Sequence, residues 1–214
     1  METTKSVIET GAVRELPMVA GHLALDFANT VDDPEGPARF DHIATFPGLL
    51  SWSVRAGDLS PEAAKRLQRA AAKQPRAAAA ALRKAHTLRH ALSRTFTAVT
   101  ANSGSATTHW ALLQPFVRDA ISRAEITPTT GAREYQLAWP DPDDFSAMLW
   151  PIAEAALTLL TGPDLHRVKR CAGCPWLFLD QSKNASRRWC AMSDCGTHEK
   201  IRRYIARRAE RRSR

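Results

Sequence analysis

The sequence CAGCPWLFLDQSKNASRRWCAMSDC at residues 171–195 contains all four cysteines of the 214-residue chain. Their spacing is C-x2-C-x15-C-x4-C, two close pairs separated by a loop long enough for a hairpin. Four thiolates at such spacing suit tetrahedral zinc, and a complete set of four leaves no open position on the metal. We therefore expect a structural zinc ion. The predicted ligands are Cys171, Cys174, Cys190 and Cys195.

The alternative is a set of reduced or disulfide-paired cysteines. A disulfide-stapled secreted protein is usually short and distributes its cysteines through the fold, whereas here one 25-residue window holds all of them. Between the pairs, residues 176–180 are typical of a strand, 181–186 of a polar turn and 187–189 of a returning strand. A segment this small has little core of its own, so zinc should contribute much of its folding free energy.

The residues after Cys195 predict a basic helix. Ile201, Tyr204, Ile205 and Ala209 form a narrow apolar stripe, which we expect to pack on the zinc hairpin. The remaining faces are strongly cationic, which is the electrostatic signature of nucleic-acid binding. The predicted nucleic-acid contacts are Arg187, Arg188, Lys200, Arg202, Arg203, Arg207, Arg208 and Arg211. A basic tail without a partner, or one that binds a membrane surface or an acidic protein, is the alternative.

The charge of the chain is divided as unevenly as its cysteines. The net charge is +8, but residues 1–166 carry 16 Lys and Arg against 18 Asp and Glu, whereas residues 167–214 carry 14 against 4. The sequence Thr-Gly-Pro-Asp at 161–164 is a helix stop. We therefore predict two domains, residues 1–163 and residues 164–214.

The first domain has mostly helical patterns. Residues 23–28 alternate between apolar and small or polar residues, which predicts a half-buried strand. Helices are expected within 46–55, from Pro61 to before Pro75 and along the apolar stripe from Leu82 to Val99. A further helix is expected within 108–123, and Pro115 should kink or divide it. Residues 125–139 favour a hairpin, and a last helix is expected to start at 141 and to kink at Pro151. Because strands and helices do not alternate regularly, the predicted class is α+β, with a small antiparallel sheet.

Other candidate sites in the first domain are less specific. Asp26 and Asn29, at the end of the predicted strand, together with Arg89, are candidates for a ligand pocket, although capping and turn hydrogen bonds are the alternative. His86 and His90 have metal-ligand spacing but lack the glutamate of HExxH. No nucleophile elbow, P-loop or dinucleotide motif occurs, so we expect no enzymatic activity. No stretch of 18 apolar residues and no secretory leader is evident, which favours a cytoplasmic protein.

Two groups of residues resemble known families. The sequences RVKRC at 167–171, WLFLDQSKNASRRWC at 176–190 and CG at 195–196, followed by a basic helix, resemble the CGNR zinc finger of bacterial proteins. The sequences LALDFANTV at 23–31, LLSW at 49–52 and LRHAL at 88–92 resemble the ABATE domain that precedes this finger. The resemblance implies an α+β domain joined to a treble-clef-like or ribbon-like zinc finger, in a family regarded as stress-induced transcription regulators.

The chain departs from the namesake motif after Cys195-Gly196. Thr197 and His198 stand where the family has Asn and Arg. Thr197 is expected to cap the following helix as Asn would, whereas the loss of Arg removes a cation and a bidentate donor. DNA affinity or sequence preference is therefore the property that this change puts in question.

The sequence as a whole predicts a zinc-dependent, DNA-binding transcription regulator with an N-terminal sensing or scaffolding domain. An RNA-binding accessory factor that uses the same surface is the first alternative, because an arginine-rich helix also binds structured RNA. A domain that binds a small-molecule effector, targeted by the finger, is the second. The sequence names no operator, effector or oligomeric state.

Overall fold

The computed structural model describes residues 8–9, 16–32, 39–102, 106–129, 134–139 and 144–212. Its helices are α1 (Leu23–Ala28), α2 (Phe46–Ala56), α3 (Pro61–Lys73), α4 (Pro75–Thr100), α5 (Ala106–Ser122), α6 (Leu149–Thr161) and α7 (Thr197–Arg212). The strands are β1 (Ile8–Glu9), β2 (Arg39–Phe40), β3 (Glu125–Pro128), β4 (Tyr135–Ala138), β5 (Val168–Arg170) and β6 (Leu177–Leu179). A 3-10 turn, η2 (Pro163–Arg167), precedes the finger, and a π turn, η3 (Met192–Gly196), carries its last cysteine. The predicted α+β class is confirmed.

Local signals start α2 and α3 where they were predicted. The Thr45 hydroxyl accepts a hydrogen bond from the Gly48 N–H at 3.1 Å, and the Ser60 hydroxyl accepts one from the Ala63 N–H at 3.1 Å. Each helix also has a proline in its first turn, where the missing N–H leaves no bond unmade. The apolar stripe of α4 is buried at Leu88, Leu92 and Phe96, as its spacing predicts.

The predicted strand at residues 23–28 is wrong, because this segment is helix α1. All its residues from Ala24 to Ala28 are buried, so the alternation in the sequence does not separate an inner from an outer face. Without an exposed face, a short apolar run does not distinguish a strand from a buried helix. Asp26, in the first turn, accepts a hydrogen bond from the Ala20 N–H at 3.0 Å, which supports the start of the helix.

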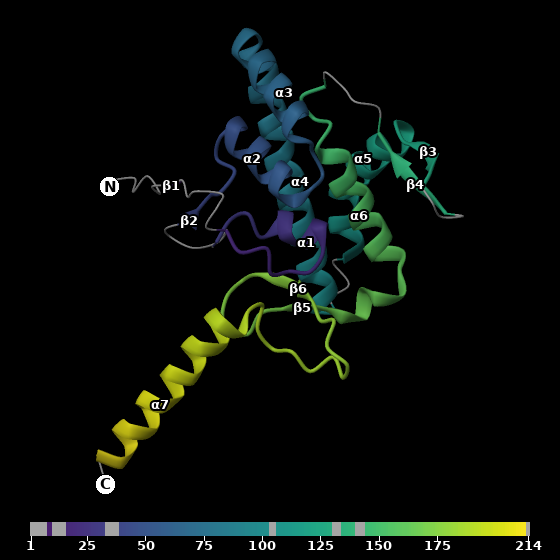
Figure 1. Cartoon of the computed structure of the whole chain (residues 1–214). Helices are drawn as coiled ribbons and strands as arrows, with labels where there is room; N and C mark the ends of the chain where they lie inside the picture. The colour runs from purple at the N-terminus through teal and green to yellow at the C-terminus, as the bar shows by residue number, and fades with distance from the viewer. Residues whose placement is uncertain are drawn as a thin grey trace.

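Helix α1 lies at the centre of the molecule. It contacts α4, α6 and β6, and α5 packs against both α4 and α6 (Figure 1). Phe27 and Trp52 meet edge to face with their ring centroids 5.0 Å apart. One continuous core extends from these residues to Leu177 and Phe178 of the finger. The finger hairpin is therefore built into the core of the N-terminal helices.

Prolines affect α5 and α6 less than the sequence suggests. Pro115 lies within α5, which continues as one helix from Ala106 to Ser122. The last helix of the domain begins at Leu149, and residues 141–143 lie outside the described residues. Pro151 therefore falls in the first turn of α6, where a proline is tolerated, and the predicted kink there has no basis.

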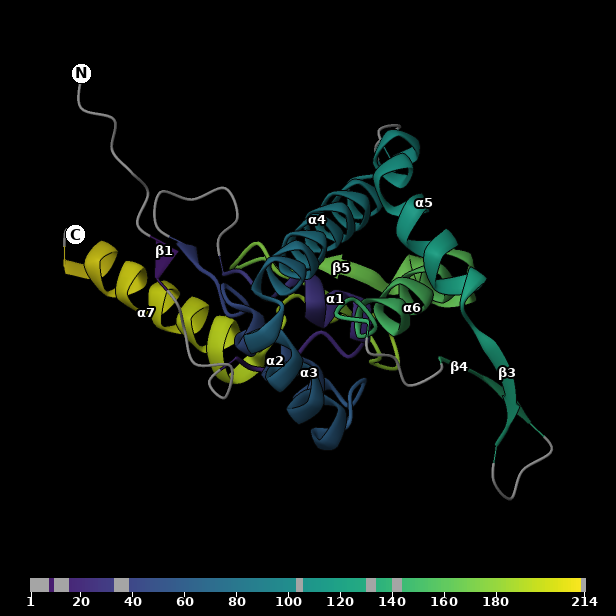
Figure 2. The ribbon, with the colours of Figure 1, turned by 90° about the horizontal axis from the view of Figure 1, so that it is seen from above.

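The two antiparallel pairs have different surroundings. The predicted hairpin between residues 125 and 139 is confirmed as β3 and β4, with Ile126 opposite Leu137, and it projects from the helices (Figure 2). In the finger, β6 falls within the predicted strand, but its partner is β5, with Lys169 opposite Phe178. The predicted returning strand at 187–189 is wrong, because this segment folds as a loop held by side-chain hydrogen bonds.

Candidate metal centre and nucleic-acid interface

The four cysteines converge at one point of the finger. Cys171 follows β5, Cys174 precedes β6, and Cys195 lies in the π turn that leads into α7. Their sulfur atoms, with that of Cys190, all lie within 4.8 Å of one another. Cys174 is half-buried and the other three are buried. Sequence spacing predicted this cluster, and no other group of three or more metal-ligating side chains comes together in the described ranges.

The geometry of the cluster fits a tetrahedral metal. The Sγ–Sγ distance is 3.7 Å from Cys174 to Cys190 and 3.8 Å from Cys190 to Cys195. Four sulfurs at 2.3 Å from a zinc ion lie about 3.8 Å apart, whereas a disulfide holds its sulfurs at about 2.05 Å. All four cysteines are free. The distances therefore favour a metal site over disulfides.

The backbone around the cluster is arranged for thiolates. The N–H groups of Gly173 and Cys190 point at the Cys171 sulfur, at 3.4 and 3.3 Å. A side chain at Gly173 would place its Cβ 3.2 Å from the Cβ of Cys195, so a larger residue would crowd this ligand. Such N–H donors stabilise negative sulfur, as second-shell groups do around a metal.

The four thiols also influence one another's acidity. A hydrogen bond from Cys190 lowers the pKa of Cys174 to about 6. Burial, together with the hydrogen bond and the charge of Cys174, raises the pKa of Cys195 to about 12. Four thiolates packed this closely are stable only around a positive ion. Zinc would be held by Cys171, Cys174, Cys190 and Cys195, and with all four positions occupied it would supply folding energy rather than catalysis.

Asp180 organises the loop between the cysteine pairs. Its buried carboxylate accepts hydrogen bonds from Lys169 Nζ at 2.7 Å, from the Arg187 N–H at 2.9 Å and from the Ser182 hydroxyl at 2.6 Å. Although burial alone would raise it, these donors hold the pKa of Asp180 well below its ordinary value. Lys169 also donates to the carbonyl of Ala185. The loop is thus ordered by one internal ion pair, which the sequence analysis did not identify.

Arg187 has a different place from the one predicted. Its guanidinium donates to the carbonyls of Trp189, Val19 and Cys190 and stacks on the Phe178 ring at 4.7 Å. These contacts tie the finger to the segment before α1. Arg188 is exposed, and its guanidinium lies 5.3 Å from the centroid of Trp189. Of these two predicted nucleic-acid contacts, only Arg188 offers its donors to the outside.

Helix α7 leads away from the body of the protein (Figure 1). Ile201, Tyr204 and Ile205 are 51%, 64% and 60% exposed, so the prediction that this stripe packs on the zinc hairpin is wrong. The apolar area that the finger can offer is already used by β6, which packs on α1 and α4. Ala209, the last residue of the stripe, is also exposed.

The cations of α7 fall into two groups. Glu199 pairs with Arg202 at 2.5 Å and with Arg203 at 2.8 Å, and the hydrogen bond from Arg203 lowers the pKa of Glu199. The exposed residues Lys200, Arg207 and Arg208 form no ion pair with another described residue. The predicted contact Arg211 lies in α7, but its side chain is outside the described part.

The start of α7 also differs from expectation. The Thr197 hydroxyl donates to the Met192 carbonyl at 2.9 Å, so it closes the π turn instead of capping the helix. His198 lies 3.7 Å from Asp194 and is exposed. Neither residue supplies the fixed cation that the Arg of the family motif would bring.

The three predicted ligand-binding residues are buried and use their polar atoms inside the protein. Asp26 accepts from Ala20, and burial raises its pKa. Asn29 bonds to the backbone of Leu177, and Arg89 forms a bidentate pair with Asp41. A ligand role for Asp26, Asn29 and Arg89 stays a prediction, and any ligand there would have to displace these contacts.

The two histidines of α4 also have internal partners. His86 Nε2 lies 2.9 Å from the Ile43 carbonyl, and His90 Nε2 accepts from Arg94 at 3.4 Å. The two rings thus use Nε2 for separate contacts.

Comparison with known families agrees with this architecture. The family model of ABATE, described as "Putative stress-induced transcription regulator", matches residues 21–163. The chain belongs to this family. The model of the CGNR zinc finger matches residues 167–208, which include the four cysteines and most of α7. No curated protein matches the chain. Among the described helices of this ABATE protein, none combines the length and the hydropathy needed to cross a membrane.

Proposed function

We propose that this ABATE protein is a transcription regulator that binds DNA through α7, presented by a zinc-bound CGNR finger. The observation that carries the proposal is the exposure of α7. Every residue from Ile201 to Ala209 is exposed, although the helix carries both cations and large apolar side chains. A helix that leaves all its faces uncovered is suited to enter the major groove, which admits one α-helix.

The charge of α7 supports an anionic partner. Arg203 and Arg207 lie four residues apart on one face, an arrangement of like charges that destabilises an isolated helix, although the ion pair of Arg203 with Glu199 offsets part of it. Phosphates placed along this face would relieve the repulsion. The free helix therefore carries more positive charge than its own acidic residues balance. In this proposal the phosphates of the nucleic acid supply the negative charge.

The apolar stripe supports groove contact rather than backbone contact alone. Ile201, Tyr204 and Ile205 lie on the same helix as the cations, within one and a half turns. In the major groove such side chains meet the methyl group of thymine, which contributes to base discrimination. In this proposal the cations position the helix and the stripe contributes to sequence preference.

Zinc enters the proposal through the turn that precedes the helix. Cys195 and Gly196 are buried in the π turn that leads directly into α7. The direction of α7 is thus set by the turn that holds the last ligand. Removing zinc should release the helix and abolish DNA binding.

The salt dependence of duplex DNA binding tests the proposal. About five phosphate contacts predict a slope of log K against log salt near −4.5. Arg207→Gln/Arg208→Gln should flatten the slope by about 2, since two contacts are lost. The matched control Arg76→Gln/Arg118→Gln removes two exposed arginines from α4 and α5 and should leave the slope unchanged.

Three results would count against the proposal: a slope near zero, equal effects of the two double variants, or undiminished binding after zinc removal. Competition between duplex DNA and structured RNA at matched salt separates the two nucleic acids. If structured RNA binds more tightly than duplex DNA, RNA is the partner of this surface instead of DNA.

A further inference from the structure

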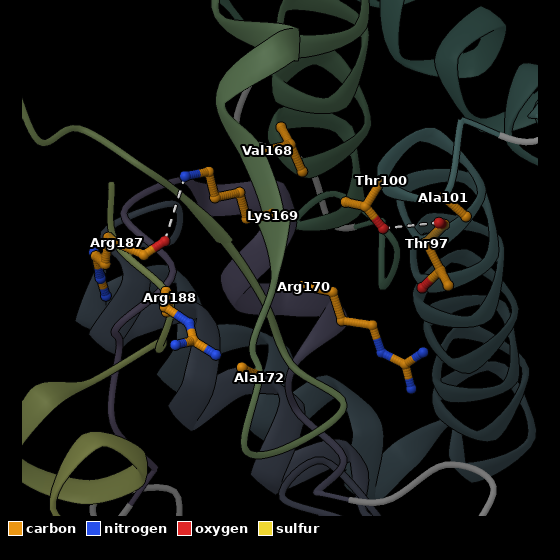
Figure 3. Close-up of a pocket in the computed structure, with 9 residues that line it drawn as sticks. All are labelled: Thr97, Thr100, Ala101, Val168, Lys169, Arg170, Ala172, Arg187 and Arg188. Atoms are coloured by element: carbon orange, nitrogen blue, oxygen red, sulfur yellow. Dashed lines mark hydrogen bonds between the residues drawn. The ribbon is translucent and has the colours of Figure 1, made fainter. Parts of the chain in front are cut away.

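A second basic feature lies at the junction of the finger and the helical domain. An open pocket of about 510 Å³ separates the C-terminal end of α4 from β5 and the loop that precedes Cys190 (Figure 3). None of the nine described residues that line it is acidic, and four are Lys or Arg. Its volume lies in the range of small-molecule sites, which favour the boundary between two structural units.

Two of the four cations are engaged within the protein. Lys169 is paired with Asp180, and Arg187 donates to backbone carbonyls. Arg170 and Arg188 are exposed and form no ion pair with another described residue. Arg170 extends from β5 toward α4, and the Arg188 guanidinium lies beside Ala172 (Figure 3). The pocket therefore has two guanidinium groups with unused donors.

The α4 side of the pocket supplies hydroxyl groups. Thr97 and Thr100 both line it, and the Thr100 hydroxyl donates to the Thr97 carbonyl at 2.8 Å. The C-terminal end of a helix is negatively polarised, which by itself opposes an anion. Here the carbonyls of the last turn already accept bonds from the Ala101 and Asn102 N–H groups, so their negative ends are partly neutralised.

We propose that this pocket binds a phosphate group, held by Arg170 and Arg188 with Thr97 on the opposite wall. Each guanidinium group donates paired hydrogen bonds whose geometry matches the oxygens of a phosphate. A hydroxyl donor in addition suits a phosphate dianion, which has more oxygens to satisfy, better than it suits a carboxylate. A phosphate in this place would connect α4 with both segments of the finger. The group could belong to a small phosphorylated molecule or to a nucleic-acid backbone. The chemistry is the same, and the proposal does not depend on DNA binding by α7.

A calorimetric titration tests the proposal. Inorganic phosphate is titrated into the zinc-loaded full chain, and chloride at matched ionic strength is the reference. We expect one saturable site. Arg170→Gln/Arg188→Gln should weaken it at least tenfold, whereas Arg76→Gln/Arg118→Gln, which removes the same charge elsewhere, should change it less than twofold. If the first variant does not fold, Thr97→Val serves in its place and should weaken phosphate binding at least threefold. Phosphate binding no tighter than that of succinate, or equal losses in test and control variants, would overturn the proposal.

Short duplex DNA distinguishes the two sources of phosphate. If the backbone occupies the pocket, DNA should displace inorganic phosphate, and Arg170→Gln/Arg188→Gln should lower the salt slope by about 2. If a small molecule occupies the pocket, the same variant should lose the binding of inorganic phosphate and keep the salt slope of DNA binding. DNA binding left unchanged by α7 variants, with phosphate binding intact, would contradict the proposed function alone.

Discussion

Asn29 and Leu177 exchange two hydrogen bonds across 148 residues of sequence. The Asn29 Nδ2 donates to the Leu177 carbonyl at 2.8 Å, and the Leu177 N–H donates to Asn29 Oδ1 at 3.0 Å. The Leu179 N–H donates to the Ala20 carbonyl at 2.8 Å in the same way. The free edge of β6 is thus covered by the segment around α1, which fixes the zinc finger to the N-terminal helices and prevents pairing with another chain.

Asn29→Ala should destabilise the protein by about 2–3 kcal/mol, because the buried N–H and C=O of Leu177 would lose their partners. Chemical denaturation of the zinc-loaded protein measures this change. Asn184→Ala, in the exposed turn of the finger, is the matched control and should stay within about 0.5 kcal/mol of the wild type. A loss at Asn29 no larger than that of the control would show that the finger does not depend on this contact.

The parts of the fold that sequence predicts depend on local signals. Thr45, Ser60 and the prolines that follow them start α2 and α3 by hydrogen bonds within three residues, so they can be located without tertiary information. The cysteine spacing likewise encodes its own chelate geometry. Both signals are independent of what the rest of the chain does.

The parts that sequence does not predict depend on distant partners. Residues 23–28 form a helix because they are buried on every side by α4, α6 and β6, which no local period reveals. Arg187 looks like a surface cation, but one of its acceptors is the Val19 carbonyl, 168 residues away. The apolar stripe of α7 suggested burial, yet β6 and its packing on α1 leave it no surface to cover. Each of these three errors therefore comes from contacts with residues distant in the sequence, which a local pattern does not show.

Arg89 and Asp41 form a buried bidentate pair, with N–O distances of 2.6 and 2.7 Å. Arg89→Met should cost about 3–5 kcal/mol, because it leaves the Asp41 carboxylate buried without its cation. Arg89→Lys should also destabilise, since a single ammonium cannot replace the fork. Arg83→Met, exposed on the same helix, provides the control. If Arg89→Met unfolds like the control, the pair does not stabilise the fold, and the residue is free for a ligand role.

The same pair predicts an acid dependence. Despite burial, the hydrogen bonds and charge of Arg89 lower the pKa of Asp41 below its ordinary value. The pair therefore stabilises the protein fully above about pH 4 and loses this contribution as the pH falls further. The difference in unfolding free energy between wild type and Arg89→Met should shrink in that range, and a constant difference down to pH 2.5 would contradict the assignment.

Asp58, after α2, has the opposite behaviour. Its carboxyl oxygens are buried, and burial raises the pKa of Asp58 to about 8, although hydrogen bonds from its own backbone and from Ser53 act in the opposite direction. In the unfolded chain the Asp58 carboxyl ionises near pH 4, whereas in the folded chain it keeps its proton up to about pH 8. The free energy of unfolding therefore falls between these two pH values and is constant above them. Asp58→Asn should remove that fall and gain at least about 1 kcal/mol at pH 8, with little effect at pH 4. The exposed control Glu62→Gln should follow the wild-type profile, and a similar profile for Asp58→Asn would contradict the buried, protonated carboxyl.

Zinc removal should affect the two ends of the finger differently. Leu177 and Phe178 belong to the core around α1, and Asn29 holds β6 without help from the metal, whereas α7 is exposed and, among the described elements, packs mainly on the turn that carries Cys195. Limited trypsin digestion after chelation should therefore cut at residues 183–212 and leave a protected fragment that ends near Asp180. Cys195→Ser should reproduce this pattern with zinc present, and Ser193→Ala, in the same turn, should not. A chain protected throughout would exclude a structural metal, whereas loss of the whole core would show that zinc, rather than Asn29, holds the finger hairpin in place.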